Sequence, residues 1–223
     1  MISLTQKTQK AFLEALLHGD RLLSSKIATE LADSPEAIKA LYEDVVKESM
    51  YRIGQLWENG EISVASEHVA SAIVEGVLNE LYARVVSGRR TERTVVAACV
   101  EDEKHQIGIK MVADVFEMHG WNVYFLGADM PCDELIRFMQ GVKPDALALS
   151  LSIYFHLPML EKMLVKIRDV FPALPILVGG QAFRYGGREV LSQYAGVDYA
   201  GNLAELEEWL THRGEHGQVR LGE

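Results

Sequence analysis

The stretch TVVAACVEDEKHQIG, residues 94–108, decides the fold of this chain. Its first part, Thr94–Val100, is apolar and rich in β-branched residues, which is typical of a buried parallel strand. A helical pattern then runs over residues 107–119 and ends at Gly120. A strand followed by a helix is the repeating unit of parallel α/β sheets. We therefore expect the polar residues between the two segments to form a loop at the carboxyl edge of a sheet, where such folds bind ligands.

The same alternation continues to residue 212 and predicts a five-stranded parallel sheet with helices on both faces, of the flavodoxin or Rossmann-like class. This α/β domain is expected over residues 93–212, and the polar tail 213–223 is expected to be flexible. The expected strands are 95–100, 121–126, 146–151, 176–178 and 199–200, and the expected helices are 107–119, 132–139, one starting near Pro158, 182–194 and 203–212.

Residues 1–88 have helical patterns throughout and predict a separate four-helix bundle. The expected helices are Leu4–Leu17, Arg21–Ala32, a third that begins at Asp33-Ser34-Pro35 and ends at Trp57 or Glu58, and a fourth capped by Ser63 or Ser66. The polar, glycine-containing segment 87–93 is the expected boundary between the two domains.

The composition limits the functional classes. The net charge of −10 argues against binding nucleic acid or an anionic membrane through a general basic surface. Two cysteines give no disulfide framework, and no apolar run approaches the length of a membrane span. Because the N-terminus also lacks the apolar core of a signal peptide, we expect a cytoplasmic protein.

His105, in the loop after the first strand, has three possible roles. It could be a loop histidine that is only hydrogen-bonded to Glu103, or a general base, although no nucleophile accompanies it. It could also be a metal ligand whose other ring nitrogen is held by Glu103. One histidine is a poor site for a free ion but a good axial ligand for a metal that a macrocycle already holds.

Small hydroxyl residues and glycines are expected at the same sheet edge, since they follow the other strands. Glycines allow a backbone to approach a ligand closely. His156 also follows the third strand and is expected to be a solvated loop histidine. The candidate binding residues in this group are Gly108, Ser150, Ser152, Tyr154, Gly179, Gly180, Gln181 and Gly201.

The pattern Glu103-x-His105-x-x-Gly108, the strand end Ser150-Leu151-Ser152 and the pair Gly179-Gly180 resemble the cobalamin-binding domain of methionine synthase, corrinoid methyl carriers and related regulators. The resemblance implies that the histidine replaces the cofactor's own benzimidazole below cobalt. It also implies that the displaced nucleotide tail lies beside the serine-bearing strand end and the glycine pair. A four-helix cap is a further family feature. The family's usual motif has aspartate where this chain has Glu103.

A second motif lies upstream, where Trp57 is followed after nine residues by Glu67-His68. It resembles the cap signature of light-sensing adenosylcobalamin regulators of the CarH type, which also tend to use glutamate in the histidine motif. That resemblance implies that Trp57 and Glu67 contact the 5′-deoxyadenosyl group above cobalt. Without it, Trp57 would be interpreted as a core aromatic residue at a helix end, and Glu67-His68 as a solvated helix start.

Two departures from the CarH type affect the hypothesis. Those regulators carry a helix-turn-helix DNA-binding domain, whereas this sequence begins at the cap, so no direct contact with nucleic acid is expected. Some of them also place a histidine directly after the tryptophan, where it captures cobalt once the adenosyl group leaves. This chain has Glu58 there, which leaves His68 as the possible ligand on the upper face.

The sequence therefore predicts a cobalamin-binding sensor with no catalytic residues and with His105 as the lower cobalt ligand. Adenosylcobalamin is the favoured cofactor, with methylcobalamin or hydroxocobalamin as alternatives. The expected output is a change in a protein partner, such as a transcription regulator, or in a homo-oligomer, with no membrane contact. The alternatives are a corrinoid methyl carrier that works with a methyltransferase, and a protein that delivers or stores the cofactor.

Overall fold

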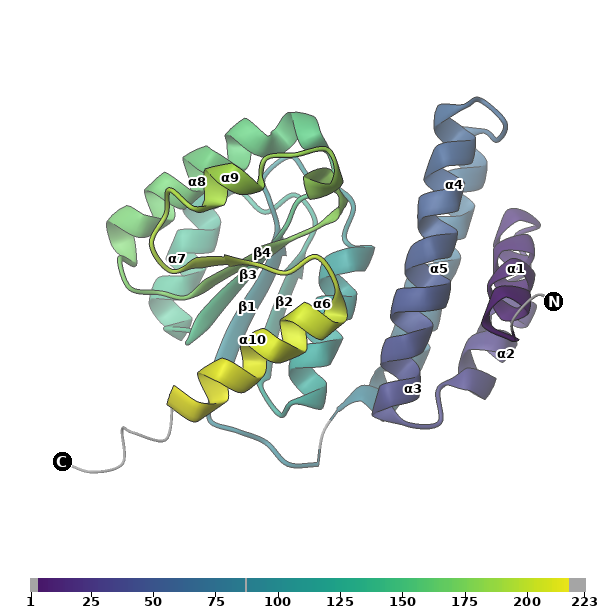
Figure 1. The fold of residues 1–223 in the computed structure, drawn as a ribbon, viewed down its shortest axis with the longest axis horizontal. Helices are drawn as coiled ribbons and strands as arrows, with labels where there is room; N and C mark the ends of the chain where they lie inside the picture. Colours follow the sequence, from purple (N-terminus) through teal and green to yellow (C-terminus); the bar gives the residue numbers. More distant parts are fainter. Residues whose placement is uncertain (1–3, 87, 217–223) are drawn as a thin grey trace. The chain divides into compact units, whose positions relative to one another are not determined.

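The computed structural model describes residues 4–86 and 88–216 (Figure 1). The chain divides into two compact units, Met1–Val86 and Ser87–Glu223. The regular elements of the first unit are helices, and the second unit is an α/β sheet domain. No helix in the described part of the chain is long and apolar enough to cross a membrane.

The first unit confirms the predicted helical bundle. The long middle helix is continuous, but its central segment is π-helical, a wider coil that propensity does not predict. Two of the predicted helix starts have a side-chain cap. Asp20 accepts from Leu23 N (2.9 Å) at the start of α2, and Ser63 accepts from Ser66 N (3.1 Å) at the start of α5. The elements are α1 Leu4–Leu17, α2 Arg21–Leu31, α3 Pro35–Ala40, π-helix η1 Leu41–Lys47, α4 Glu48–Glu58 and α5 Val64–Val85.

Large apolar side chains hold this bundle together. Phe12, Tyr42, Ile53 and Leu78 are fully buried and come from four different helical segments. Each contributes roughly 1.5–3 kcal/mol through burial of its side chain. The bundle therefore has its own core, as expected for a separate unit.

The second unit confirms the predicted five-stranded parallel sheet with flanking helices. The strand order is β2-β1-β3-β4-β5, with each neighbouring pair parallel. The strands are β1 Thr94–Cys99, β2 Asn122–Gly127, β3 Ala146–Ser150, β4 Ile176–Gly179 and β5 Val197–Tyr199. The helices are α6 Ile107–Met118, α7 Cys132–Val142, 3₁₀ helix η2 Tyr154–His156, α8 Leu157–Val170, 3₁₀ helix η3 Gln181–Arg184, α9 Arg188–Leu191 and α10 Leu203–His216.

Both faces of the sheet are covered. Helices α7 and α8 contribute buried side chains to a core that includes Val96 and Ala98 of β1. Helices α6 and α10 pack against each other on the other side, where Phe116 lies edge-on to both Trp121 and Trp209 (Figure 1). A central strand between two helical layers must be apolar on both faces, which explains the run Thr94–Val100.

Several predicted bounds differ from those in the structure. The helix expected over 182–194 is broken, because Gly186 and Gly187 have φ of 119° and 89° and separate η3 from the short α9. Strand β5 begins at Val197, two residues before the predicted start. Residues 213–216 of the expected tail continue α10, and 217–223 lie outside the described residues.

Candidate functional site

The loop after β1 is fixed to the neighbouring loop after β2. Glu103 N donates to Val100 O (3.0 Å), which closes a tight turn, and Asp102 within that turn has a left-handed φ of 69°. The side chain of Asp129 accepts from Asp102 N (3.1 Å), and Asp129 N donates to Glu103 O (2.7 Å). These bonds hold the motif residues in place on a segment that belongs to neither a strand nor a helix.

The carboxylate of Glu103 is fully buried and accepts hydrogen bonds on both oxygens. Its Oε1 accepts from His105 N (3.0 Å) and lies 2.5 Å from His105 Nδ1. Its Oε2 accepts from Ser152 N (2.9 Å) and Ile153 N (2.8 Å), directly after β3. One side chain thus joins the loops that follow two adjacent strands.

These contacts lower the pKa of Glu103. Burial is the largest single influence on its pKa and raises it, as expected for a carboxyl group removed from water. The hydrogen bonds from the His105 ring and from the backbone N–H groups of His105, Ile153 and Ser152 together outweigh burial and lower the pKa from 4.5 to about 2. Glu103 is therefore a carboxylate at neutral pH.

The ring of His105 is oriented by this carboxylate and is half exposed, with 52% of the side chain accessible. Because Nδ1 faces Glu103, a metal would be bound through Nε2, and the carboxylate would make that nitrogen more basic. Within residues 4–86 and 88–216, no group of three or more His, Cys, Asp or Glu side chains could hold a metal ion. The donor set therefore fits one axial position on a metal that a macrocycle already holds.

The start of α6 lies next to the end of β3. Gly108 is in the first turn of that helix, and a Cβ added there would have Ser150 Oγ, at 3.9 Å, as its nearest neighbour. Ser150 ends β3 and is only 5% exposed. A Cβ at position 108 would therefore be in ordinary van der Waals contact with the serine-bearing strand end.

The glycine pair at the end of β4 packs closely against neighbouring backbone. A Cβ on Gly180 would lie 2.1 Å from Leu151 O, and a Cβ on Gly179 would lie 2.7 Å from Ala200 O. The glycines therefore allow neighbouring backbone segments to approach each other closely. Contact between this pair and a ligand stays a prediction.

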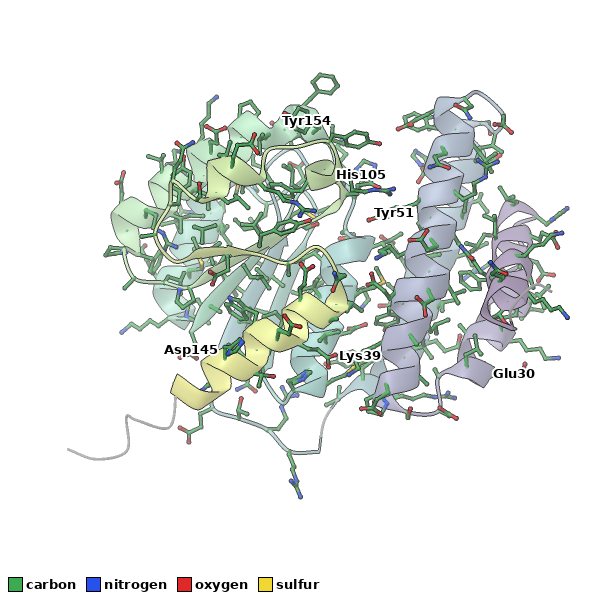
Figure 2. The ribbon with its side chains drawn as sticks, in the orientation of Figure 1. Glu30, Lys39, Tyr51, His105, Asp145 and Tyr154 are labelled. Atoms are coloured by element: carbon green, nitrogen blue, oxygen red, sulfur yellow. The ribbon has the colours of Figure 1, made fainter. Side chains whose placement is uncertain are left out.

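The remaining predicted rim residues lie along the same edge. Ser152 contributes its backbone N–H to Glu103, and Gly201 N donates to Glu205 Oε2 (2.7 Å). Gln181 is partly buried at the start of η3. Tyr154 is 41% exposed, and Figure 2 shows it at the same edge of the sheet as His105, opposite Asp145.

The upstream motif lies at one end of the α4–α5 helix pair in the helical unit. Trp57, next to the end of α4, is 46% exposed, so it is not a core aromatic residue. Glu67, in the first turn of α5, accepts from Ser71 Oγ (2.7 Å) and lies 2.6 Å from His68 Nδ1. The His68 side chain is 74% exposed. This pair repeats, in the helical unit, the carboxylate–histidine contact seen at Glu103.

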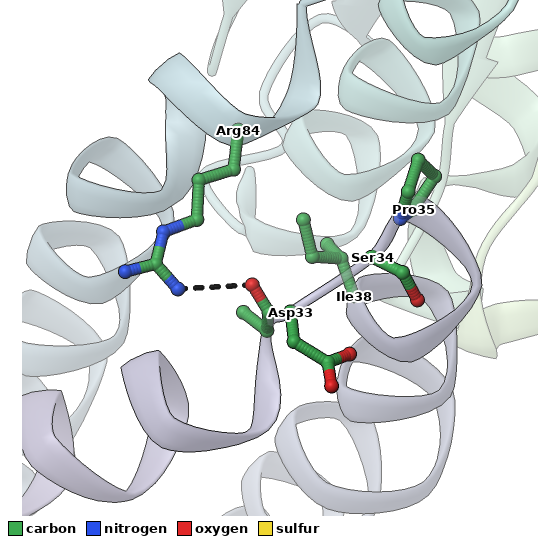
Figure 3. A pocket seen from close by; sticks show the side chains of 6 residues that line it. Asp33, Ser34, Pro35, Ile38 and Arg84 are labelled. Atoms are coloured by element: carbon green, nitrogen blue, oxygen red, sulfur yellow. Dashed lines mark hydrogen bonds between the residues drawn. The ribbon is translucent and has the colours of Figure 1, made fainter.

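A pocket of about 290 Å³ lies at the other end of α5 and is separate from this motif (Figure 3). Arg84, in the last turn of α5, donates through Nη1 to Thr29 O (2.8 Å) and Ala32 O (2.9 Å). The guanidinium thus closes the carbonyl end of α2. The pocket is lined by Ala32, Asp33, Ser34, Pro35, Ile38 and Arg84.

His156 is a site residue that the sequence interpretation missed. Its side chain is only 26% exposed, and its Nδ1 lies 3.6 Å from Glu103 Oε2. It is therefore not a solvated loop histidine. Its position six residues after Ser150, in the loop at the same sheet edge, was the available signal.

Comparison with known proteins identifies the family. A model described as B12 binding domain matches residues 93–206, and a second model with the same description matches residues 8–82. The chain belongs to the B12-binding domain family. It is thus a cobalamin-binding protein, with a helical cap that precedes the α/β domain.

Relatives of this B12-binding chain include both transcriptional repressors and corrinoid proteins. The HTH-type transcriptional repressor CarH of Myxococcus xanthus is 29% identical over 177 residues, which are 79% of this chain and 58% of the repressor. The methanol–corrinoid protein of Methanosarcina barkeri is 31% identical over 107 residues, which are 47% of this chain and 40% of that protein. The chain therefore spans only about half the length of these relatives.

A solved structure with the same fold is the Methanosarcina barkeri monomethylamine corrinoid protein. It matches with a TM-score of 0.76 over 92% of this chain and 97% of that chain, at 13% identity. At this identity the likeness shows the fold alone. The family thus supports a cobalamin cofactor, and both transcriptional repressors and corrinoid proteins are among the relatives.

Proposed function

We propose that this protein is an adenosylcobalamin-binding photoreceptor whose output is a change in a protein partner or in a homo-oligomer. The observation that carries the cobalt-binding part of the proposal is the Glu103–His105 pair, and the exposed Trp57 beside Glu67 favours the sensor over a carrier. A fully buried carboxylate orients a half-exposed imidazole through Nδ1, so Nε2 is the ring nitrogen for cobalt. His105 is then the lower axial ligand, and Glu103 tunes its basicity.

The nucleotide tail of the cofactor is proposed to enter beside Gly108 and Ser150. These two residues are close together, and they lie at the carboxyl edge, where α/β sheets bind ligands. Polar and small groups line the rest of the edge, as a polar tail requires. The further tail-binding residues that we propose are Ser152, Tyr154, Gly179, Gly180, Gln181 and Gly201.

Trp57, Glu67 and His68 are proposed to bind the upper ligand. An exposed indole at a helix end has no role in the core of the bundle, and it suits contact with a flat, partly apolar group. Glu67 is held by Ser71 and His68, so its oxygens are positioned to accept hydrogen bonds from ribose hydroxyls. Adenosylcobalamin supplies a cobalt–carbon bond that visible light can break. His68 is the side chain that we propose as a replacement ligand.

The output is proposed to act through protein contacts. A net charge of −10 disfavours direct binding to nucleic acid and supports a protein partner or a second copy of the chain. A cytoplasmic location remains part of this proposal. No residue is assigned a catalytic role.

The second candidate is a corrinoid methyl carrier, favoured by the relatedness to the methanol–corrinoid protein. Such a carrier would use the same lower ligand. It would have to open the upper face to a methyltransferase, and the bulky Trp57 together with Glu67 does not favour such access. Preference for methylcobalamin and methyl transfer with a cognate enzyme would support this candidate.

The decisive experiment loads the protein with adenosylcobalamin in the dark and compares its visible spectrum and its size in solution before and after green light. We expect both to change. Trp57→Ala should lower the affinity for adenosylcobalamin much more than for hydroxocobalamin, because only the former carries the adenosyl group. Leu22→Ala, which removes an apolar side chain that is 85% exposed on α2, is the matched control and should change neither affinity.

Two results would contradict the proposal that the protein is a light sensor. The first is a spectrum and a size that are the same in the dark and after illumination. The second is equal loss of affinity for both cofactors in Trp57→Ala, which would place the indole away from the upper ligand. Either result, with efficient methyl transfer, would favour the carrier.

A further inference from the structure

Residues 89–93, which precede β1, are bound to the turn between α6 and β2, and we call them the strap. Thr91 N donates to Gly120 O (2.7 Å), and the Thr91 hydroxyl donates to the same oxygen (3.1 Å). Gly120 has a φ of 79°, and a Cβ at that position would lie 2.2 Å from Arg89 O. Only glycine permits so close an approach. The strap is therefore part of the α/β unit rather than a free linker.

The Arg90 side chain adds three contacts to the same turn. Its Nη1 forms an ion pair with the carboxylate of Glu117, whose side chain is only 8% exposed. Its Nη2 donates to Trp121 O (2.7 Å) and to Asn122 Oδ1 (3.2 Å). A planar guanidinium can bind several acceptors at once, whereas the ammonium group of a lysine is a point charge. Arg90 therefore ties the strap both to the end of α6 and to the start of β2.

The rest of the strap is held as well. Asn122 N donates to Arg93 O (2.8 Å), and Asn122 Nδ2 donates to Thr91 O (3.3 Å). The guanidinium of Arg93 lies 5.5 Å from the centre of the Trp121 ring, within the range of a cation–π contact. A passive connection between two units would need none of these contacts. They point to a role in how the two units act together.

Because of the strap, little of the chain remains as a tether between the units. Helix α5 ends at Val85, and β1 begins at Thr94. Without the strap, the tether would comprise the eight residues 86–93, whereas with it only the three residues 86–88 remain. The effective concentration of one tethered unit at the other falls roughly as the −3/2 power of the tether length. Lengthening the tether from three residues to eight would therefore lower this concentration about four-fold.

We propose that Arg90 is a positioning residue that holds the strap on the α6–β2 turn and thereby raises the effective concentration of the helical unit at the cofactor. This inference rests on the proposed function, in which Trp57 and Glu67 of the helical unit bind the upper ligand and His105 of the α/β unit binds cobalt from below. Arg90 itself touches neither ligand. It therefore favours a cofactor that both units bind over one that only the α/β unit binds.

The first arm of the test uses the protein without cofactor and measures the strap itself. Arg90→Gln removes the guanidinium. Arg90→Lys keeps a cation beside Glu117, so it tests the strap even if Arg90→Gln fails to fold. Hydrogen exchange at Thr91 N–H should accelerate about ten-fold in Arg90→Gln, because an ion pair and two hydrogen bonds are lost, and to a smaller extent in Arg90→Lys.

Arg137→Gln is the matched control for both arms. Arg137 also pairs with a carboxylate, that of Glu134 (2.8 Å), but on an exposed part of α7. Helix α7 covers the face of the sheet opposite to α6. This substitution should change neither the exchange of Thr91 N–H nor the affinity for a cofactor.

The second arm compares two alkylcobalamins in the dark. Both carry an alkyl group above cobalt, and only adenosylcobalamin presents an adenosyl group to Trp57 and Glu67. The dissociation constant for adenosylcobalamin should rise about four-fold in Arg90→Gln, while that for methylcobalamin stays at the wild-type value. A merely structural role of Arg90 in the α/β unit would weaken the binding of both cofactors alike, since both use His105.

The two arms separate the inference from the proposed function. Wild-type exchange at Thr91 N–H in both Arg90 variants, or equal acceleration in Arg137→Gln, would overturn the strap. Faster exchange with unchanged affinities, or with equal loss for both cofactors, would overturn its effect on the upper ligand. If the wild-type protein takes up neither cobalamin, the proposed function fails, while the exchange measurement still decides whether Arg90 holds the strap.

Discussion

Replacing Glu103 with alanine should lower the free energy of unfolding of the α/β unit by about 3 kcal/mol or more. The substitution leaves three backbone N–H groups, those of His105, Ser152 and Ile153, without their acceptor. Each unsatisfied buried donor costs roughly 1–3 kcal/mol, and water that enters the space left by the side chain recovers only part of this. Urea denaturation of the cofactor-free protein measures the loss.

Glu101→Ala is the matched control for this variant. Glu101 lies in the same loop, but its side chain accepts from one backbone N–H, that of Cys132 (3.0 Å). Its loss should cost about 1 kcal/mol. Equal destabilisation by the two substitutions would contradict the central structural role of Glu103.

The same carboxylate makes the stability of the wild-type protein depend on pH. Because folding lowers the pKa of Glu103 from 4.5 to about 2, its ionisation stabilises the folded state above pH 4.5. That stabilisation is lost as the pH falls from 4.5 toward 2. The difference in stability between wild type and Glu103→Ala should therefore shrink over this range.

Gly180→Ala should destabilise the α/β unit by about 4 kcal/mol or prevent it from folding. Its φ of 117° is strained for any residue with a Cβ, at roughly 1–3 kcal/mol. The added Cβ would also lie 2.1 Å from the oxygen and 2.7 Å from the carbon of the Leu151 carbonyl. A strand end of a packed sheet cannot move away without further loss, which adds a similar amount. Thermal unfolding followed by circular dichroism provides the measurement.

Gly141→Ala is the corresponding control. This exposed glycine lies in α7, and a Cβ there would meet nothing within 4 Å. Alanine should leave stability unchanged or raise it by up to about 1 kcal/mol, since it restricts the unfolded chain. A Gly180→Ala protein as stable as Gly141→Ala would show that the close approach of Leu151 and Gly180 is wrong.

The fold was predictable where a local pattern and a tertiary requirement agree. Thr94–Val100 is apolar because both faces of β1 are covered, and Ser63 caps α5 because its hydroxyl accepts a backbone N–H. The prediction of one helix over 182–194 was wrong because Gly186 and Gly187 adopt positive φ. The two glycines stand in the sequence, and their conformational preference outweighs the helical pattern around them.

The site was predictable only in part. The spacing of Glu103 and His105 indicated their hydrogen bond, which the structure shows. The donors Ser152 N and Ile153 N could not be identified, because backbone N–H groups leave no signal in a sequence. The position of His156 after the third strand indicates this sheet edge, but its approach to Glu103, 53 positions earlier in the chain, depends on the tertiary structure and leaves no local signal.

The central claim is that His105 is the lower ligand of cobalt. Its most direct measurement is the visible spectrum of the hydroxocobalamin-loaded protein, compared between wild type, His105→Ala and the remote control His119→Ala. The account predicts that His105→Ala alone shifts the spectrum to that of cobalamin without protein imidazole, with a loss of affinity. A His105→Ala protein with the spectrum and affinity of the wild type would contradict the claim.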